Sequence, residues 1–104
     1  MGGSADSDIR VIEAPDSVAI ELRGTLDVFL AQRFAEAALH CVESGLCTTL
    51  DCSALERMDA SALQIVLALR NALRAKAQVL RVANVPANVA AYLELAGVRE
   101  LAQV

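Results

Sequence analysis

Residues 50–64 read LDCSALERMDASALQ, and the rest of the chain can be placed around this stretch. The pattern predicts the end of a strand, a short loop and the first turn of a long helix. Ser61 at the helix start, with Gln64 three residues later, matches a Ser-x-x-Gln capping box. A helix start has unpaired N–H groups and a positive dipole end, so it also tolerates a phosphate. Ser61 is therefore predicted as a helix cap, and it is also a candidate charge switch.

Length and composition predict one α/β domain. The chain has 104 residues, of which 56% are hydrophobic and only 3% aromatic. A single core of Leu, Val, Ala and Ile suits helices packed on a sheet. The net charge of −4 argues against nucleic acid and against an anionic membrane surface. No apolar run approaches the roughly 20 residues of a membrane span, so direct membrane insertion is not expected.

The first part of the chain predicts a tail followed by a hairpin. Residues 1–8 are mostly Gly, Ser and Asp, and we expect a disordered tail before a single domain at 9–104. The runs 9–14 and 18–22 predict two strands, joined by a Pro-Asp-Ser turn. Gly24 is expected to end the second strand.

The remaining chain alternates helical and strand patterns. Helical periodicity covers three segments, at about 30–44, 61–76 and 86–97. Short apolar runs at 47–50 and 78–83 predict strands, and residues 98–104 predict either an edge strand or a last turn. Alternation implies parallel strands joined by right-handed crossovers. The predicted fold is a small α/β sheet of four to five strands with helices packed on it.

Two leucines of the long helix have two possible roles. Leu63 and Leu67 fall on the shoulder of its apolar face. They either pack under a neighbouring loop or helix or, if exposed, form an apolar docking patch beside Ser61.

The chain shows no set of catalytic residues. His40, the only histidine, is predicted as a solvated helix residue, and no Gly-rich phosphate loop is present. Asp27, Asp51 and Asp59 could gather near strand ends as oxygen ligands for a hard cation, but ordinary capping explains them better. We therefore expect neither an enzyme nor a cofactor or metal site.

The cysteines indicate a reducing compartment. The chain has three, with no Cys-x-x-Cys spacing. Free thiols and a cytoplasmic location are therefore expected.

Five short motifs occur in the order found in the STAS family. They are Gly24–Asp27, Leu50–Ser53, Met58–Leu63, Val82–Val85 and Leu93–Val98. Over nearly its whole length the chain therefore resembles the STAS domain of sulfate transporters and anti-sigma factor antagonists. The resemblance implies an α/β fold and a non-catalytic bacterial binding module.

The resemblance also implies roles for several residues. Ser61 matches the serine that a partner kinase, itself the anti-sigma factor, phosphorylates in anti-sigma factor antagonists. The unmodified antagonist binds this kinase and frees the sigma factor, whereas the phosphorylated one does not. Asp59 matches the acid of the same motif, and Asp27 matches the acid of an upstream loop near the partner surface.

This chain departs from the family motif on both sides of the serine. Ala62 stands where the family has Gly, and Ala60 replaces the first motif serine, so one acceptor remains. An alternative function is a constitutive STAS subunit or scaffold of a lipid-transport ABC system or chemotaxis-type signalling assembly. In that case Ser61 is only a cap, and Leu63 and Leu67 contact the partner.

Overall fold

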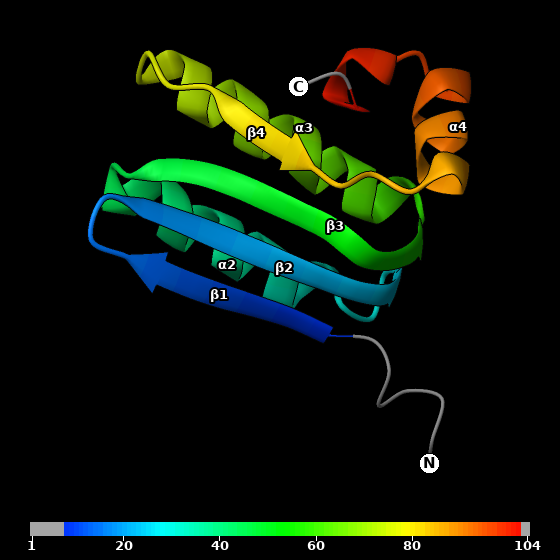
Figure 1. The fold of residues 1–104 in the computed structure, drawn as a ribbon, viewed down its shortest axis with the longest axis horizontal. Helices are drawn as coiled ribbons and strands as arrows, with labels where there is room; N and C mark the ends of the chain where they lie inside the picture. Colours follow the sequence, from blue (N-terminus) through cyan, green and yellow to red (C-terminus); the bar gives the residue numbers. More distant parts are fainter. Residues whose placement is uncertain (1–7, 103–104) are drawn as a thin grey trace.

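The computed structural model describes residues 8–102, which form one four-stranded sheet with helices packed on it (Figure 1). The elements are β1 (Asp8–Ala14), β2 (Ser17–Leu26), α2 (Ala31–Ser44), β3 (Cys47–Met58), α3 (Ala60–Ala75), β4 (Leu80–Ala83), α4 (Ala87–Leu95) and the 3-10 helix η1 (Arg99–Ala102). The predicted tail at 1–8 lies outside the described residues except for Asp8, which begins β1. Residues 103–104 also lie outside them.

The strands lie in the order β1-β2-β3-β4, and their directions confirm the predicted hairpin and parallel crossovers. β1 pairs antiparallel with β2, with Ile9 opposite Leu22. β2 and β3 are parallel, as are β3 and β4, so that Ile20, Leu50 and Val82 lie in one row across the sheet. Arg99–Ala102 forms the last turn, which was one of the two predictions for that segment.

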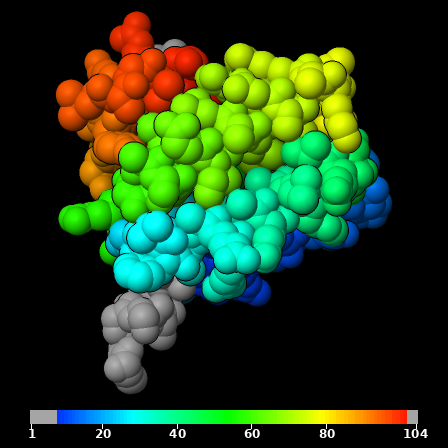
Figure 2. All heavy atoms as spheres, turned by 180° about the vertical axis from the view of Figure 1, so that it is seen from behind, coloured from blue at the N-terminus to red at the C-terminus, as the bar shows by residue number. Residues whose placement is uncertain are grey.

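Two helices cover one face of this sheet. Figure 1 shows α2 and α3 behind the strands, and the rear view in Figure 2 shows them side by side. β2 and β3 end together, with Leu26 paired to Met58, so α2 and α3 both begin at this edge. In parallel sheets the carboxyl edge of the strands is where binding sites tend to lie.

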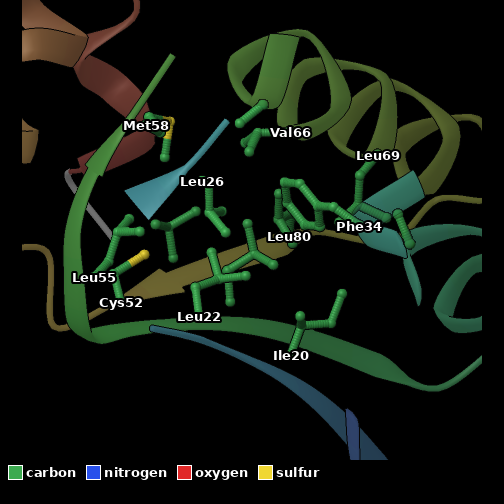
Figure 3. Packing of buried hydrophobic residues seen from close by; sticks show 14 of the residues in the cluster. Ile20, Leu22, Leu26, Phe34, Cys52, Leu55, Met58, Val66, Leu69 and Leu80 are labelled. Atoms are coloured by element: carbon green, nitrogen blue, oxygen red, sulfur yellow. The ribbon is translucent and has the colours of Figure 1, made fainter. Parts of the chain in front are cut away.

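The core between sheet and helices is almost entirely aliphatic, as the composition predicts. Its largest fully buried side chains include Ile20, Leu22, Leu26, Leu50, Leu69 and Leu73. Figure 3 shows Ile20, Leu22, Leu26 and Leu69 in one cluster with Phe34 of α2, which has no exposed surface. Within residues 8–102, none of the helices combines the length and the hydropathy needed to cross a membrane.

β3 is much longer than the predicted strand at 47–50. Its pairing with β2 shifts register twice, and each time β3 advances one residue more than β2. Such bulges interrupt the alternation of buried residues: after Leu50 and Cys52 the next buried positions are Leu55 and Met58. Buried residues spaced three apart lack the alternation of a strand and resemble a loop in sequence. Asp51 was therefore wrongly expected at the end of a strand, whereas it lies within β3.

The expectation that Gly24 ends β2 is also wrong. Gly24 lies inside β2, beside the second register shift, and has a φ of 76°. A residue with a side chain rarely adopts this conformation, which explains why glycine occurs here without ending the strand.

Candidate functional site at the start of α3

The start of α3 is capped by Asp59, not by Ser61. Asp59 has an extended backbone, and its Oδ1 accepts the N–H of Ala62 at 3.1 Å. Ser61 therefore lies inside the first turn, where its hydroxyl donates to the same Oδ1 at 2.6 Å. The predicted capping box, with Ser61 as the cap, is wrong because the carboxylate two residues earlier takes the free N–H group of the helix.

Hydrogen bonds keep the Asp59 carboxylate charged. Donation by the Ser61 hydroxyl is the largest cause that lowers its pKa, followed by the N–H of Ala62. The backbone N–H groups of Ser61 and Val28 add to this effect. A half-buried hydroxyl is thus held beside a negative charge at the N-terminal end of a helix.

Asp27 shapes the neighbouring loop between β2 and α2. Its carboxylate accepts the N–H of Phe29 at 3.0 Å, and its backbone carbonyl accepts that of Leu30, also at 3.0 Å. Asp27 therefore precedes α2 and does not cap it, since no side chain caps this helix. The backbone N–H of Asp59 donates to the carbonyl of Leu26, which ties this loop to the start of α3.

The same loop exposes two apolar side chains that the sequence analysis did not single out. Val28 is 62% exposed and Phe29 is 88% exposed. Both are adjacent in sequence to Asp27, and Val28 contacts the Asp59 carboxylate through its backbone. The sequence did contain a signal for this surface: Phe29 is an aromatic residue that does not belong to the apolar stripe of α2, the helix that follows it.

The two shoulder leucines do not form the exposed patch considered above. Leu63 is only 7% exposed and belongs to the core, whereas Leu67 is half-buried and packs against it. Arg70 follows on the same flank of α3 and forms an ion pair with Glu100 of η1 at 3.2 Å. This flank packs toward the C-terminal elements, so Leu63 is not available to a partner.

The three aspartates considered for a cation do not gather. Asp51 lies within β3, where it accepts the N–H of Ser53 at 3.0 Å and the side chain of Asn84 at 3.2 Å. These two contacts lower its pKa, that of Ser53 more strongly. Within residues 8–102 no group of three or more His, Cys, Asp or Glu side chains is arranged to hold a metal ion.

His40 lies where the sequence predicted it, exposed on α2. Its Nε2 contacts a carboxylate oxygen of Glu13 on β1, and more than half of each side chain is exposed. This contact attaches α2 to the edge of the sheet, on the side away from Ser61.

Comparison with solved structures shows the same fold in anti-sigma factor antagonists. One from Mycobacterium paratuberculosis is 19% identical, with a TM-score of 0.79 over 89% of this chain and 80% of that one. A putative one from Thermotoga maritima is 14% identical, with a TM-score of 0.78 over 89% and 81%. The Bacillus cell fate determinant SpoIIAA, in its phosphorylated form, is 19% identical, with a TM-score of 0.70 over 90% and 87%.

Sequence comparison places the chain in a family. No curated protein matches it. The family model described as "Mlab, STAS domain" matches residues 9–103, which include every described helix and all of the described strands except Asp8, the first residue of β1. Since this match spans almost the whole chain and the fold agrees, the chain belongs to the STAS domain family.

Proposed function

We propose that this chain is a protein-binding module of the anti-sigma factor antagonist type, switched by phosphorylation of Ser61 by a partner serine kinase. The observation that carries the proposal is the Ser61 hydroxyl, half-buried in the first turn of α3 and 2.6 Å from the Asp59 carboxylate. Asp27 and the exposed side chains of Val28 and Phe29 belong to the loop beside it.

The local electrostatics support a switch that changes partner binding while the fold stays intact. A phosphate adds about two negative charges, which the N-terminal end of α3 stabilises through its dipole and free N–H groups. The same charges lie beside the ionised Asp59 carboxylate, which also contacts the backbone of Val28 in the loop that exposes Phe29. A partner with an apolar surface would have to desolvate the phosphate, so modification weakens binding.

Mass spectrometry tests the acceptor directly. Cleavage after Arg57 and Arg70 releases a peptide in which Ser61 is the only hydroxyl-bearing residue. We expect one phosphate on this peptide after incubation with ATP and the partner kinase from the host, and none in the Ser61→Ala variant. The proposal fails if Ser61 stays unmodified in the host and Ser61→Asp binds the partner as the wild type does.

One observation favours a second candidate, a constitutive subunit or scaffold. The hydroxyl of Ser61 already serves a structural purpose, because it donates to the carboxylate that caps α3. In this case Ser61→Ala and Ser61→Asp both retain the partner. The same binding measurement therefore separates the two functions.

A further inference from the structure

The hydrogen bond between Ser61 and Asp59 places a proton acceptor at the oxygen that the proposed kinase modifies. Ser61 Oγ donates to Asp59 Oδ1 at 2.6 Å, the length of a charge-assisted O–H···O⁻ bond. A serine in a helix often donates instead to a backbone carbonyl one turn earlier. A carbonyl orients a hydroxyl but does not take its proton, whereas a carboxylate can do both. Ser61 therefore has a base from its own chain in contact with its reactive oxygen.

The geometry leaves Ser61 Oγ available as a nucleophile. A serine hydroxyl has one hydrogen and two lone pairs, and only the hydrogen takes part in the bond to Asp59. Ser61 is half-buried, so a nucleotide held by another protein can approach the lone pairs.

The first turn of α3 holds the carboxylate in place. Asp59 Oδ1 also accepts the N–H of Ala62 at 3.1 Å, and the carbonyl of Asp59 accepts the N–H of Leu63 at 3.0 Å. The position of this base is therefore fixed before a kinase binds.

The charge of Asp59 suits this role. The Ser61 hydroxyl and the N–H of Ala62 hold the pKa of Asp59 below its ordinary value of 3.8, so the carboxylate is ionised at neutral pH. A low pKa makes a weak base, but a serine hydroxyl becomes strongly acidic as its oxygen bonds to phosphorus. Protein kinases use an aspartate of their catalytic loop to accept this proton. A carboxylate is therefore basic enough at the moment of transfer.

Other ionisable side chains near this edge are engaged elsewhere. The carboxylate of Asp27 accepts the N–H of Phe29 in the neighbouring loop. His40 contacts Glu13 on the side of α2 away from Ser61. These groups leave Asp59 as the carboxylate in position to act on Ser61 Oγ.

We propose that Asp59 is the general base for phosphorylation of Ser61, so that the substrate supplies this catalytic group to the kinase. The inference rests on the proposed function. A lone pair of Ser61 Oγ forms a bond to the γ-phosphorus of ATP, while the bond from this phosphorus to the β–γ bridging oxygen breaks and leaves its electron pair on ADP. The hydroxyl proton passes to Asp59 Oδ1 and then to water, which reaches the half-buried side chain.

Single-turnover phosphoryl transfer tests the role of Asp59. The full chain and radiolabelled ATP are mixed with the serine kinase that is purified from the host by its labelling of the wild-type chain. The rate at saturating chain concentration reports the transfer step, and the half-saturation concentration reports binding. Asp59→Asn keeps an oxygen that accepts both hydrogen bonds, but its amide does not take the proton.

We expect Asp59→Asn to lower the saturated rate by roughly 100-fold or more, as loss of a general base does, with an unchanged half-saturation concentration. Asp59→Ala, which also loses the acceptor oxygen, should be at least as slow. The matched control is Asp51→Asn, which removes the same charge from a carboxylate within β3 and should react as the wild type does. Circular dichroism and urea midpoints verify that each variant is folded.

Three outcomes overturn this inference while the switch at Ser61 stands. If Asp59→Asn reacts at the wild-type rate and Asp59→Ala is slow, the carboxylate only orients the hydroxyl. A loss confined to the half-saturation concentration assigns Asp59 to partner binding. An equal loss of rate in Asp51→Asn assigns the effect to overall charge. If no kinase of the host labels Ser61 in the wild type, the proposed function fails and this inference fails with it.

Discussion

The hydroxyl of Ser61 donates a hydrogen bond of 2.6 Å to Oδ1 of Asp59, and the same oxygen accepts the N–H of Ala62 at 3.1 Å. One carboxylate thus caps α3 and fixes the side chain of the proposed phosphate acceptor. A phosphate ester on Ser61 has no hydroxyl hydrogen to donate, so modification removes this contact and adds charge in its place.

Substitutions at these positions should affect stability unequally. Ser61→Ala removes one hydrogen bond and should lower the free energy of unfolding by about 1 kcal/mol. Asp59→Ala removes the acceptor of both bonds and should cost more. Urea denaturation measures both, with the exposed Gln64→Ala as control. If Gln64→Ala lowered the free energy of unfolding as much as Asp59→Ala does, the predicted capping box of Ser61 and Gln64 would be supported instead.

Acid should weaken the protein partly through Asp59. Its folded pKa is lowered from 3.8, chiefly by the Ser61 hydroxyl, so the unfolded chain binds the proton more readily. The stabilisation is present above about pH 4 and is lost as the pH falls through the lowered pKa. Urea midpoints from pH 7 to pH 3 should therefore fall more steeply for the wild type than for Asp59→Asn.

The Asn variant is a matched control because its amide oxygen still accepts hydrogen bonds but does not titrate. Asp8 and Asp51, whose pKa values are also lowered, remain in both proteins and cancel in the comparison. Parallel pH curves for the two proteins would show that Asp59 does not contribute.

Phosphorylation of Ser61 should raise the pKa of Asp59. The carboxylate loses its strongest donor and gains a like charge beside it, and both changes disfavour ionisation. Carboxyl carbon NMR shifts followed against pH report this pKa in protein with phosphoserine at 61. Ser61→Ala, which loses only the donor, should give a smaller rise. An equal rise in both proteins would mean that the phosphate points away from Asp59.

Thiol chemistry should distinguish the cysteines. Cys41 and Cys52 are 0% and 2% exposed, and burial raises the pKa of Cys41 and brings that of Cys52 to about 12. Cys47 is exposed, so the folded protein should react quickly at only this thiol with a disulfide reagent near pH 8. In denaturant all three thiols should react quickly. The Cys47→Ser variant should lack the fast reaction of the folded protein. Rapid reaction of two thiols in that variant would contradict the packing.

Much of the fold is readable from local patterns. The helical periodicity correctly predicts that Phe34, Ala38 and Cys41 face the core, because α2 packs on one face of the sheet and buries a single stripe. Gly45 ends α2 with a φ of 71°, the left-handed conformation that favours glycine directly after a helix. Strand directions are also set by local connections. The short turn between β1 and β2 makes this pair antiparallel, and the helices that connect β2 to β3 and β3 to β4 make those pairs parallel.

Other features depend on how strands pair with one another, which no local sequence pattern indicates. β3 continues past Cys52 only because β2 lies beside it and the bulges keep the two strands together. The cap of α3 passes to Asp59 because β3 extends to Met58, which leaves one residue between strand and helix. Sequence spacing favoured Ser61 instead, because the Ser-x-x-Gln pattern of a capping box begins there.

The sequence by itself determined the α/β class, the STAS membership and the position of one hydroxyl, Ser61, near a helix start. Tertiary structure decided that Leu63 is covered whereas Phe29 and Leu39 face solvent. Each helix has two flanks beside its buried stripe, and the apolar periodicity of the sequence does not distinguish one flank from the other. Which flank is covered depends on the elements packed next to it, here η1 beside α3 and β1 beside α2.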